Sequence, residues 1–234
     1  NDDPELLLEM TLPISIIEIP IERKINIIAD IKTLIRLFLI FKREGFKSVH
    51  TITPKAGLLG IVASFLARTP IRIHTFQGEF WKNTTGFSRM FFISLDKIVA
   101  SFATNITVVS KSERNFLIQE KILKNDQAKV LGEGTICGVD LERFVKNPNQ
   151  RRLSRSRAGY IDNEIVFAYV GRLNNEKGLH ILAGAFKSLF SNYNNARLLI
   201  IGPDEDGTAE KLKNFSSQFD PGVVNILPFM KNPE

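Results

Sequence analysis

Cysteine is nearly absent from the sequence, which has one residue of this type, Cys137, among 234. One cysteine forms no intramolecular disulfide, and the common cysteine-based metal patterns are excluded with it. Long apolar runs are also missing. The most apolar stretch, residues 31–41, is about half as long as a membrane span needs to be and contains Lys32 and Arg36. The opening letters NDDPE are acidic and do not resemble a signal peptide. We therefore expect a protein of the reducing cytoplasm, in which residues 31–41 form a helix that packs against a sheet and does not lie in lipid. Any membrane contact is expected to be peripheral and salt-sensitive.

The glycine-rich signatures of two large nucleotide-binding classes are absent as well. Neither G-x-G-x-x-G nor G-x-x-x-x-G-K-[ST] occurs, which argues against a dinucleotide dehydrogenase or a P-loop enzyme. The formal net charge of +6 favours an anionic partner. The basic residues are neither gathered into one long run nor interleaved with aromatic residues as in nucleic-acid modules. We expect no nucleic acid partner, which leaves a phosphorylated metabolite or an acidic membrane surface.

Short β-rich runs alternate with helical patterns through the first half of the chain. Such an alternation predicts a parallel sheet with helical crossovers. The expected strands are residues 15–19, 48–52, 71–76, 105–110 and 129–134, and the expected helices run to about residue 45 and cover about 55–68, 86–104 and 113–122.

A second alternation begins after a basic segment with few apolar residues, KNPNQRRLSRSRAG at 146–159. We expect this segment to be an interdomain connection that turns into a short helix. The strands expected beyond it are residues 164–171, 196–202 and 223–227, with helices over 178–190 and about 208–219.

The predicted fold class is therefore α/β, with two Rossmann-like doubly wound domains that are both incomplete. The expected domains are residues 1–147 with the first strand missing, a linker at 148–159, and a truncated domain at 160–234.

The strongest chemical signal is the loop after the strand expected at 164–171. Arg172 and Lys177 lie five residues apart in this loop, and a helix is expected from Gly178. Backbone N–H groups at a helix start, flanked by two cations, suit a diphosphate. A solvated loop with scattered charges is the alternative.

The stretch G-R-x-x-x-E-K-G that contains these residues resembles the donor-binding signature of the retaining glycosyltransferases of family four (group 1), which have the GT-B fold. The resemblance implies that Arg172 and Lys177 hold the donor's diphosphate and stabilise charge on the leaving group. It makes Gly171, Glu176 and Gly178 further donor-binding positions.

Four more segments extend the resemblance over nearly the whole chain. They resemble the acceptor domain of capsule and lipopolysaccharide transferases, and they are HTITPKAGLLG, RIHTFQGEFW, VVSKSERNFL and GVDLERF.

The acceptor-side candidates follow the strand expected at 71–76. Gln77, Gly78 and Glu79 lie at the carboxyl end of this strand, where ligands of open α/β sheets collect. Many family members carry a His immediately before the glycine, where this sequence has Gln77. His74 lies three residues earlier, an odd offset that places it on the opposite face of a regular strand, so a structural and a functional role both stay open. Lys55, at an expected helix start, is a candidate for contact with an acceptor phosphate.

We expect no metal and no cofactor, because the nucleotide sugar is a substrate. The acidic segment GPDEDG at 202–207 is interpreted as a turn near the nucleotide. Asp140, Ser110 and Ser112 suit helix caps or turns.

The resemblance implies an enzyme that moves a hexosyl or N-acetylhexosaminyl group, with retention, from a nucleotide-diphosphate sugar to a glycan or lipid-linked acceptor. A UDP-sugar donor, cell-surface polysaccharide synthesis and a peripheral contact with the inner face of the membrane are further implications. Two alternatives stay open: a GT-B-fold nucleotide-sugar epimerase and a degenerate subunit that binds without catalysis. Because parts of the family's donor site fall outside these 234 residues, we expect this chain by itself not to turn over.

Overall fold

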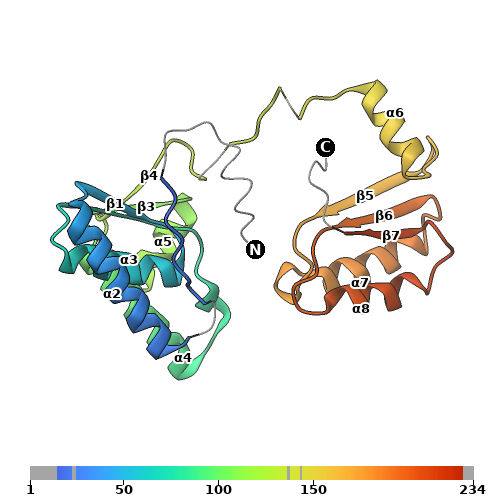
Figure 1. Ribbon diagram of the computed structural model, residues 1–234. Coiled ribbons are helices and arrows are strands. Elements are labelled where there is room, and N and C mark those ends of the chain that lie inside the picture. Colours follow the sequence, from blue (N-terminus) through green and yellow to red (C-terminus); the bar gives the residue numbers. More distant parts are fainter. Residues whose placement is uncertain (1–14, 23–24, 136–137, 143, 229–234) are drawn as a thin grey trace. The chain divides into compact units, whose positions relative to one another are not determined.

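The computed structural model of the protein describes residues 15–22, 25–135, 138–142 and 144–228 (Figure 1). The chain divides into two compact units, Asn1–Gly138 and Val139–Glu234. The boundary expected from the sequence, 147/148, lies farther along the chain, so residues 139–147 go with the second unit. Cys137 lies outside the described residues.

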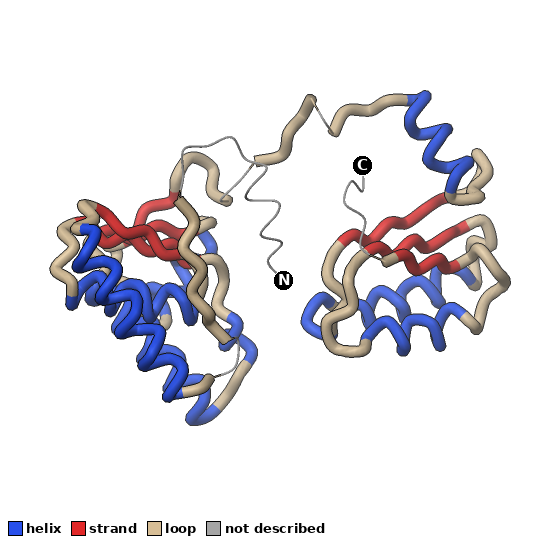
Figure 2. The backbone as a smooth tube through the Cα atoms, viewed as in Figure 1, coloured by secondary structure: helices blue, strands red, loops and turns tan. Residues whose placement is uncertain are grey.

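The first unit contains a four-stranded parallel sheet of order β1-β2-β3-β4. Helices alternate with these strands, as the sequence pattern predicted (Figure 2). The strands are β1 (Ser48–Thr51), β2 (Ile71–Phe76), β3 (Asn105–Val108) and β4 (Ala128–Val130), and the helices are α2 (Ile27–Glu44), α3 (Pro54–Leu66), η1 (Phe80–Asn83), α4 (Gly86–Phe102) and α5 (Lys111–Gln119).

The strand expected at 15–19 is wrong. Residues 15–22 pair with no strand, and Ile19 packs with Leu37 of α2 and Leu59 of α3. The Thr33 hydroxyl of α2 donates a hydrogen bond of 3.1 Å to the Pro20 carbonyl. The run SIIEI has two adjacent isoleucines and therefore lacks the strict alternation of a half-buried strand. Ile19 is half-buried against the helices, whereas Ile16 and Ile17 remain 45% and 49% exposed.

Helix α2 packs mainly against α3, so the expected packing on the sheet needs correction. The left-handed Gly45, with a φ of 62°, ends the helix where the sequence predicted. Several aliphatic side chains of α2 remain more than half exposed, namely Ile27, Ile28, Ile31, Ile35 and Leu39. Among the described residues, no helix combines the length and the apolar character that crossing a bilayer requires.

The second unit contains a three-stranded parallel sheet of order β5-β6-β7, with α7 and α8 along the same face (Figure 2). The segment expected to be a linker folds as a helix from Pro148, capped by the Asn147 side chain. The strands are β5 (Ile165–Val170), β6 (Ala196–Ile201) and β7 (Val224–Leu227), and the helices are α6 (Pro148–Arg157), η2 (Asn175–Lys177), α7 (Leu179–Phe190) and α8 (Thr208–Ser216).

Each unit buries its own core. In the second unit, Leu173 and Leu179 are 2% and 1% exposed and pack with Leu198 and Ile200 of β6. Burying one such side chain stabilises the fold by roughly 1.5–3 kcal/mol. These two leucines flank residues 174–178, so the polar loop between them is anchored at both ends.

Candidate functional site

The donor-side loop connects β5 to α7. The Asn174 side chain accepts a hydrogen bond of 3.2 Å from the Lys177 N–H and caps the short helix η2. Gly178 is left-handed, with a φ of 70°, and is the N-cap of α7. Arg172, Glu176 and Lys177 are all exposed. The structure thus places the predicted donor-binding residues on one exposed loop before a helix start.

A second loop, residues 202–207, lies directly against the donor-side loop. The Leu173 N–H donates to the Pro203 carbonyl at 2.8 Å, and the Glu205 N–H donates to the Leu173 carbonyl at 3.1 Å. At Gly202, an added Cβ would lie 1.8 Å from the Gly171 carbonyl oxygen, so a side chain does not fit there. The glycine at 202 therefore lets the two backbones approach each other.

Arg172 is bound by an acidic side chain of this second loop. Its Nη1 lies 3.1 Å from both carboxylate oxygens of Glu205, and the Asn174 side-chain amide donates to Glu205 at 2.9 Å. The Arg172 side chain remains 47% exposed. Glu205 was not singled out from the sequence, although the acidic GPDEDG turn was the available signal.

Asp206, the neighbour of Glu205, closes the second loop. Its carboxylate accepts hydrogen bonds from the Thr208 hydroxyl at 2.5 Å and from the Asn175 N–H at 3.0 Å. These bonds, Thr208 first, hold the pKa of Asp206 below its usual value. In the part of the chain that the structure describes, no group of His, Cys, Asp and Glu side chains is arranged to hold a metal ion.

On the acceptor side, His74 is buried in the first unit, with 3% exposure. Its Nδ1 lies 2.8 Å from the Thr51 hydroxyl, and its ring packs edge-on against Phe76. Burial, followed by the charge of His50, lowers the pKa of His74 to about 4. A Cβ on Gly57 of α3 would lie 2.5 Å from the imidazole. This packing favours the structural role for His74.

A small cavity of about 130 Å³ lies at the carboxyl end of β2. It brings together four of the five acceptor-side candidates, His74, Gln77, Gly78 and Glu79. The fifth, Lys55, does not line it. The Lys55 ammonium lies 2.6 Å from the Asp30 carboxylate of α2.

Two carboxyl groups line this cavity. Burial raises the pKa of Glu79 to about 8, and the carboxylates of Glu113 and Asp96 add to the shift. Burial also raises the pKa of Asp96 to about 6, although the Trp81 indole N–H donates to this carboxylate at 2.6 Å. The cavity therefore offers carboxyl groups of unusual basicity beside aromatic walls.

Asp96, Trp81 and Glu113 were not found from the sequence. Asp96 lies three residues after Ile93 and three before Val99, on the buried face of α4, which was the available signal. Glu113 stands three residues after Ser110, the spacing of a capping box, and Ser110 does cap α5.

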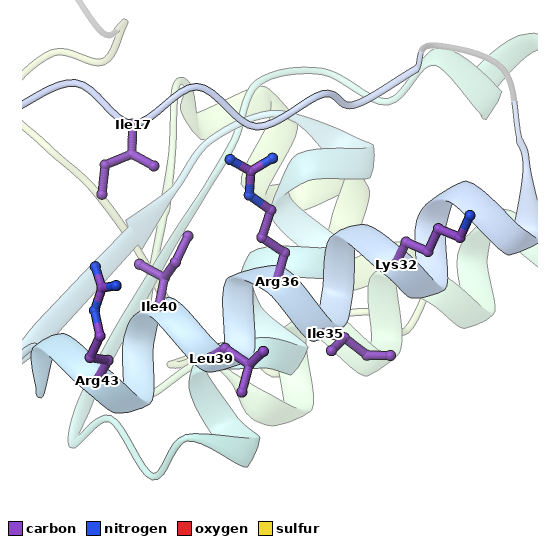
Figure 3. Close-up of a pocket in the computed structure, with 7 residues that line it drawn as sticks. All are labelled: Ile17, Lys32, Ile35, Arg36, Leu39, Ile40 and Arg43. Carbon is purple, nitrogen blue, oxygen red and sulfur yellow. The ribbon is translucent and has the colours of Figure 1, made fainter.

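A wider, open groove of about 550 Å³ runs along α2 (Figure 3). Aliphatic and cationic side chains alternate in its lining, and Arg36 and Ile40 rise from the helix on the side of the segment that carries Ile17 (Figure 3). Its lining residues are Ile17, Lys32, Ile35, Arg36, Leu39, Ile40 and Arg43.

The protein is thus of the α/β class, with two Rossmann-like units and a cationic loop at the carboxyl edge of a strand. Residues 150–233 match the family described as glycosyl transferases group 1. These residues therefore belong to that family, and they include the whole donor-side loop.

Curated relatives extend the similarity to most of the chain. The chain is 34% identical over 210 residues to the capsular polysaccharide biosynthesis glycosyltransferase CapM of Staphylococcus aureus, covering 89% of this chain and 54% of the relative. It is 31% identical over 171 residues to an Escherichia coli UDP-Gal:alpha-D-GlcNAc-diphosphoundecaprenol alpha-1,3-galactosyltransferase, covering 73% of this chain and 43% of the relative. The chain thus spans about half the length of these relatives.

Solved structures share the fold. Anabaena Alr3699/HepE, in complex with UDP and glucose, matches with a TM-score of 0.68 at 18% identity, over 90% of this chain and 55% of that one. The UDP-GlcNAc 2-epimerase of Neisseria meningitidis matches with a TM-score of 0.59 at 12% identity, over 91% and 57%. At such identities the likeness concerns the fold alone, and it confirms the predicted GT-B class.

Proposed function

We propose that the protein transfers a sugar from a nucleotide-diphosphate sugar, with retention, to a glycan or lipid-linked acceptor in cell-surface polysaccharide synthesis. The observation that carries the proposal is the exposed Arg172–Lys177 loop inside the group 1 family match. The names of the two curated relatives, a capsular polysaccharide enzyme and a lipid-linked galactosyltransferase, support this acceptor class. UDP in a solved relative of the fold supports a UDP-sugar donor.

In the proposed reaction, the bond between the anomeric carbon and the donor's diphosphate breaks, and the diphosphate leaves with the electron pair. The acceptor hydroxyl passes its proton to an oxygen of the departing diphosphate as its own oxygen bonds to the anomeric carbon on the same face of the ring. Arg172 and Lys177 stabilise the growing negative charge on the diphosphate. A bound diphosphate competes with Glu205 for the Arg172 guanidinium, because both are anionic acceptors of its hydrogen bonds.

The acceptor is proposed to bind at the small cavity of the first unit. Gln77 and Glu79 supply polar groups at its mouth, Gly78 shapes the loop, and His74 forms part of the wall. Lys55 is left out of this proposed site because it lies outside the lining and is paired with Asp30.

A peripheral contact with the inner, cytoplasmic face of the membrane is proposed at the α2 groove, which revises the expectation that residues 31–41 do not lie in lipid, because Ile35 and Leu39 are exposed there. Exposed aliphatic side chains favour insertion at the boundary between headgroups and acyl chains, and basic residues favour anionic lipid. Ile35→Asp should reduce sedimentation with anionic vesicles, whereas Ile181→Asp, which also replaces an isoleucine more than half exposed, should not. Equal binding to neutral vesicles, or no effect of Ile35→Asp, would contradict this site.

The test of the donor is a thermal-shift screen of the full-length protein with nucleotide sugars. A donor at about 100 times its Kd adds roughly 2.7 kcal/mol of stability, which is a measurable rise in Tm. A UDP-sugar should raise the Tm more than UMP, which lacks the diphosphate. No shift with any nucleotide sugar would support the alternative of a non-catalytic subunit.

The epimerase alternative shares the fold and needs no acceptor. Incubation with the stabilising donor separates the two activities. Sugar transfer that requires an added acceptor supports the proposal, and conversion of the donor without an acceptor supports an epimerase.

A further inference from the structure

Glu113 is a buried acidic residue that the proposed chemistry does not use. It is 9% exposed and stands at the third position of α5. One carboxylate oxygen accepts a hydrogen bond from the Gly78 N–H, and the other accepts from the Val109 N–H at 3.0 Å. A single side chain thus connects the loops that leave two neighbouring strands, β2 and β3.

This bonding pattern departs from a local helix cap. In a capping box, the third-position carboxylate returns to the N–H of the N-cap residue itself. Here the N-cap is Ser110, whose hydroxyl accepts from the Glu113 N–H at 3.1 Å, but the carboxylate reaches past it. One oxygen binds the preceding residue, Val109, and the other binds a loop 35 residues earlier in the chain. The side chain therefore makes a tertiary connection.

The loop bound by Glu113 is the proposed acceptor loop. Gln77 is exposed, and Gly78 has a φ of 92° with open space around the position of a Cβ. Farther along, Trp81 is 1% exposed and anchored to Asp96. The Gly78 bond to Glu113 thus holds the loop between β2 and the buried tryptophan, and it fixes the plane of the peptide that joins Gln77 to Gly78.

We propose that Glu113 is a positioning residue that holds Gln77–Gly78–Glu79 in the conformation that presents Gln77 and Glu79 to the acceptor. The proposal rests on the proposed transferase function. The Glu113 carboxylate acts through two backbone N–H groups and does not touch the acceptor. Because the donor-side loop belongs to the other unit, loss of Glu113 should change acceptor use and leave donor use unchanged.

The test compares Glu113→Gln with the control Glu44→Gln in the full-length protein. Gln keeps the size of Glu but turns an N–H₂ group toward one of the two N–H donors, so at least one charge-assisted bond is lost. The acceptor KM should rise about tenfold or more while the donor KM stays within about twofold. Glu44 is the last residue of α2, pairs with Arg43 and does not line the cavity, so its variant should behave as wild type. An unchanged acceptor KM in Glu113→Gln would overturn the proposal.

A second measurement does not depend on transfer. Trp81 is the one tryptophan of the 234-residue chain, and its ring stacks on Phe116 of α5. In this chain, Glu113→Gln should increase quenching of tryptophan fluorescence by acrylamide relative to Glu44→Gln. If Glu113→Gln does not fold, Glu113→Asp keeps the charge and shortens the reach, and the same increase is expected.

The outcomes separate the two proposals. Increased quenching in a protein that transfers no sugar would retain the loop assignment and reject the transferase. Normal quenching and a normal acceptor KM in an active enzyme would reject the positioning role alone.

Discussion

Replacing Gly202 by Ala tests whether the donor-side loop depends on the close approach of two backbones. The new Cβ would lie 1.8 Å from the Gly171 carbonyl oxygen and 2.8 Å from its carbonyl carbon. Both atoms are backbone, so no flexible side chain can move aside. Overpacking of a well-packed site costs about 1–3 kcal/mol, and this contact belongs at the upper end of that range. For a unit of this size, about 3 kcal/mol corresponds to a fall in Tm of roughly 10 °C or more.

The displaced Gly171 is followed directly by Arg172, so the same change should weaken binding of a nucleotide diphosphate. Gly184→Ala is the matched control, because Gly184 lies within α7 and a Cβ there meets no atom within 4 Å. Alanine in a helix interior is favoured over glycine by about 0.5–1 kcal/mol, so this control should be at least as stable as wild type. Denaturant unfolding measures both variants, and calorimetry with UDP measures binding. Wild-type stability and affinity in Gly202→Ala would refute the reasoning.

Three further outcomes are expected. Arg172→Ala should weaken nucleotide-diphosphate binding about tenfold or more, since a charge-assisted hydrogen bond contributes roughly 1.5–3 kcal/mol. The control Lys213→Ala should leave this binding unchanged. Equal affinities of the two variants in calorimetry would contradict the assignment. The pKa of His74 falls from 6.5 to about 4 on folding, so this residue contributes stability that is present above pH 6.5 and lost as the pH falls toward 4. The loss is about 3 kcal/mol, and denaturant unfolding at several pH values should show it in wild type and not in His74→Asn. Glu79, with a pKa of about 8, is mostly protonated at pH 7. Glu79→Gln should therefore keep the acceptor KM near the wild-type value at pH 7 and remove a pH dependence of this KM centred near 8. An unchanged pH profile would argue against Glu79 as its source.

The two carboxyl groups of the cavity suit hydrogen bonding to a sugar hydroxyl of the proposed acceptor. A protonated Glu79 donates a hydrogen bond as well as accepting one, which suits a sugar hydroxyl. Glu113, Asp96 and Lys82 are the charged groups that act on Glu79, and the two acids outweigh the lysine. The proposed acceptor site therefore depends on residues from three elements, and a change in any of them should alter it.

The sequence by itself determined the order of strands and helices along the chain, because each element carries its own periodic pattern of apolar residues. The parallel sheets and the end of α2 at Gly45 followed from this pattern. The strand expected at 15–19 is wrong, because a short isoleucine-rich run can also lie along helices, with Ile19 packed against them and Ile16 and Ile17 exposed. The local sequence pattern does not distinguish packing along helices from pairing in a sheet.

The donor-side loop was also found from sequence, because its residues are contiguous and follow a buried strand. The sequence placed Arg172 and Lys177 on one loop, but their joint contact with a diphosphate stays a prediction. The ion pair between Arg172 and Glu205 joins residues 33 positions apart. It forms because β5 pairs with β6, which brings the two loops together.

On the proposed acceptor side, Gln77, Gly78 and Glu79 were predicted from the sequence, and the groups that surround them came from the tertiary structure. Burial and the contacts with Thr51 and Gly57 make His74 a packed residue, which its strand offset left open. Glu113 and Asp96 reach the Gln77–Glu79 loop from α5 and α4, across long separations in sequence. The physical reason is that periodicity tells which face of an element is buried, whereas the groups that face one another across a cavity are set by how the elements pack.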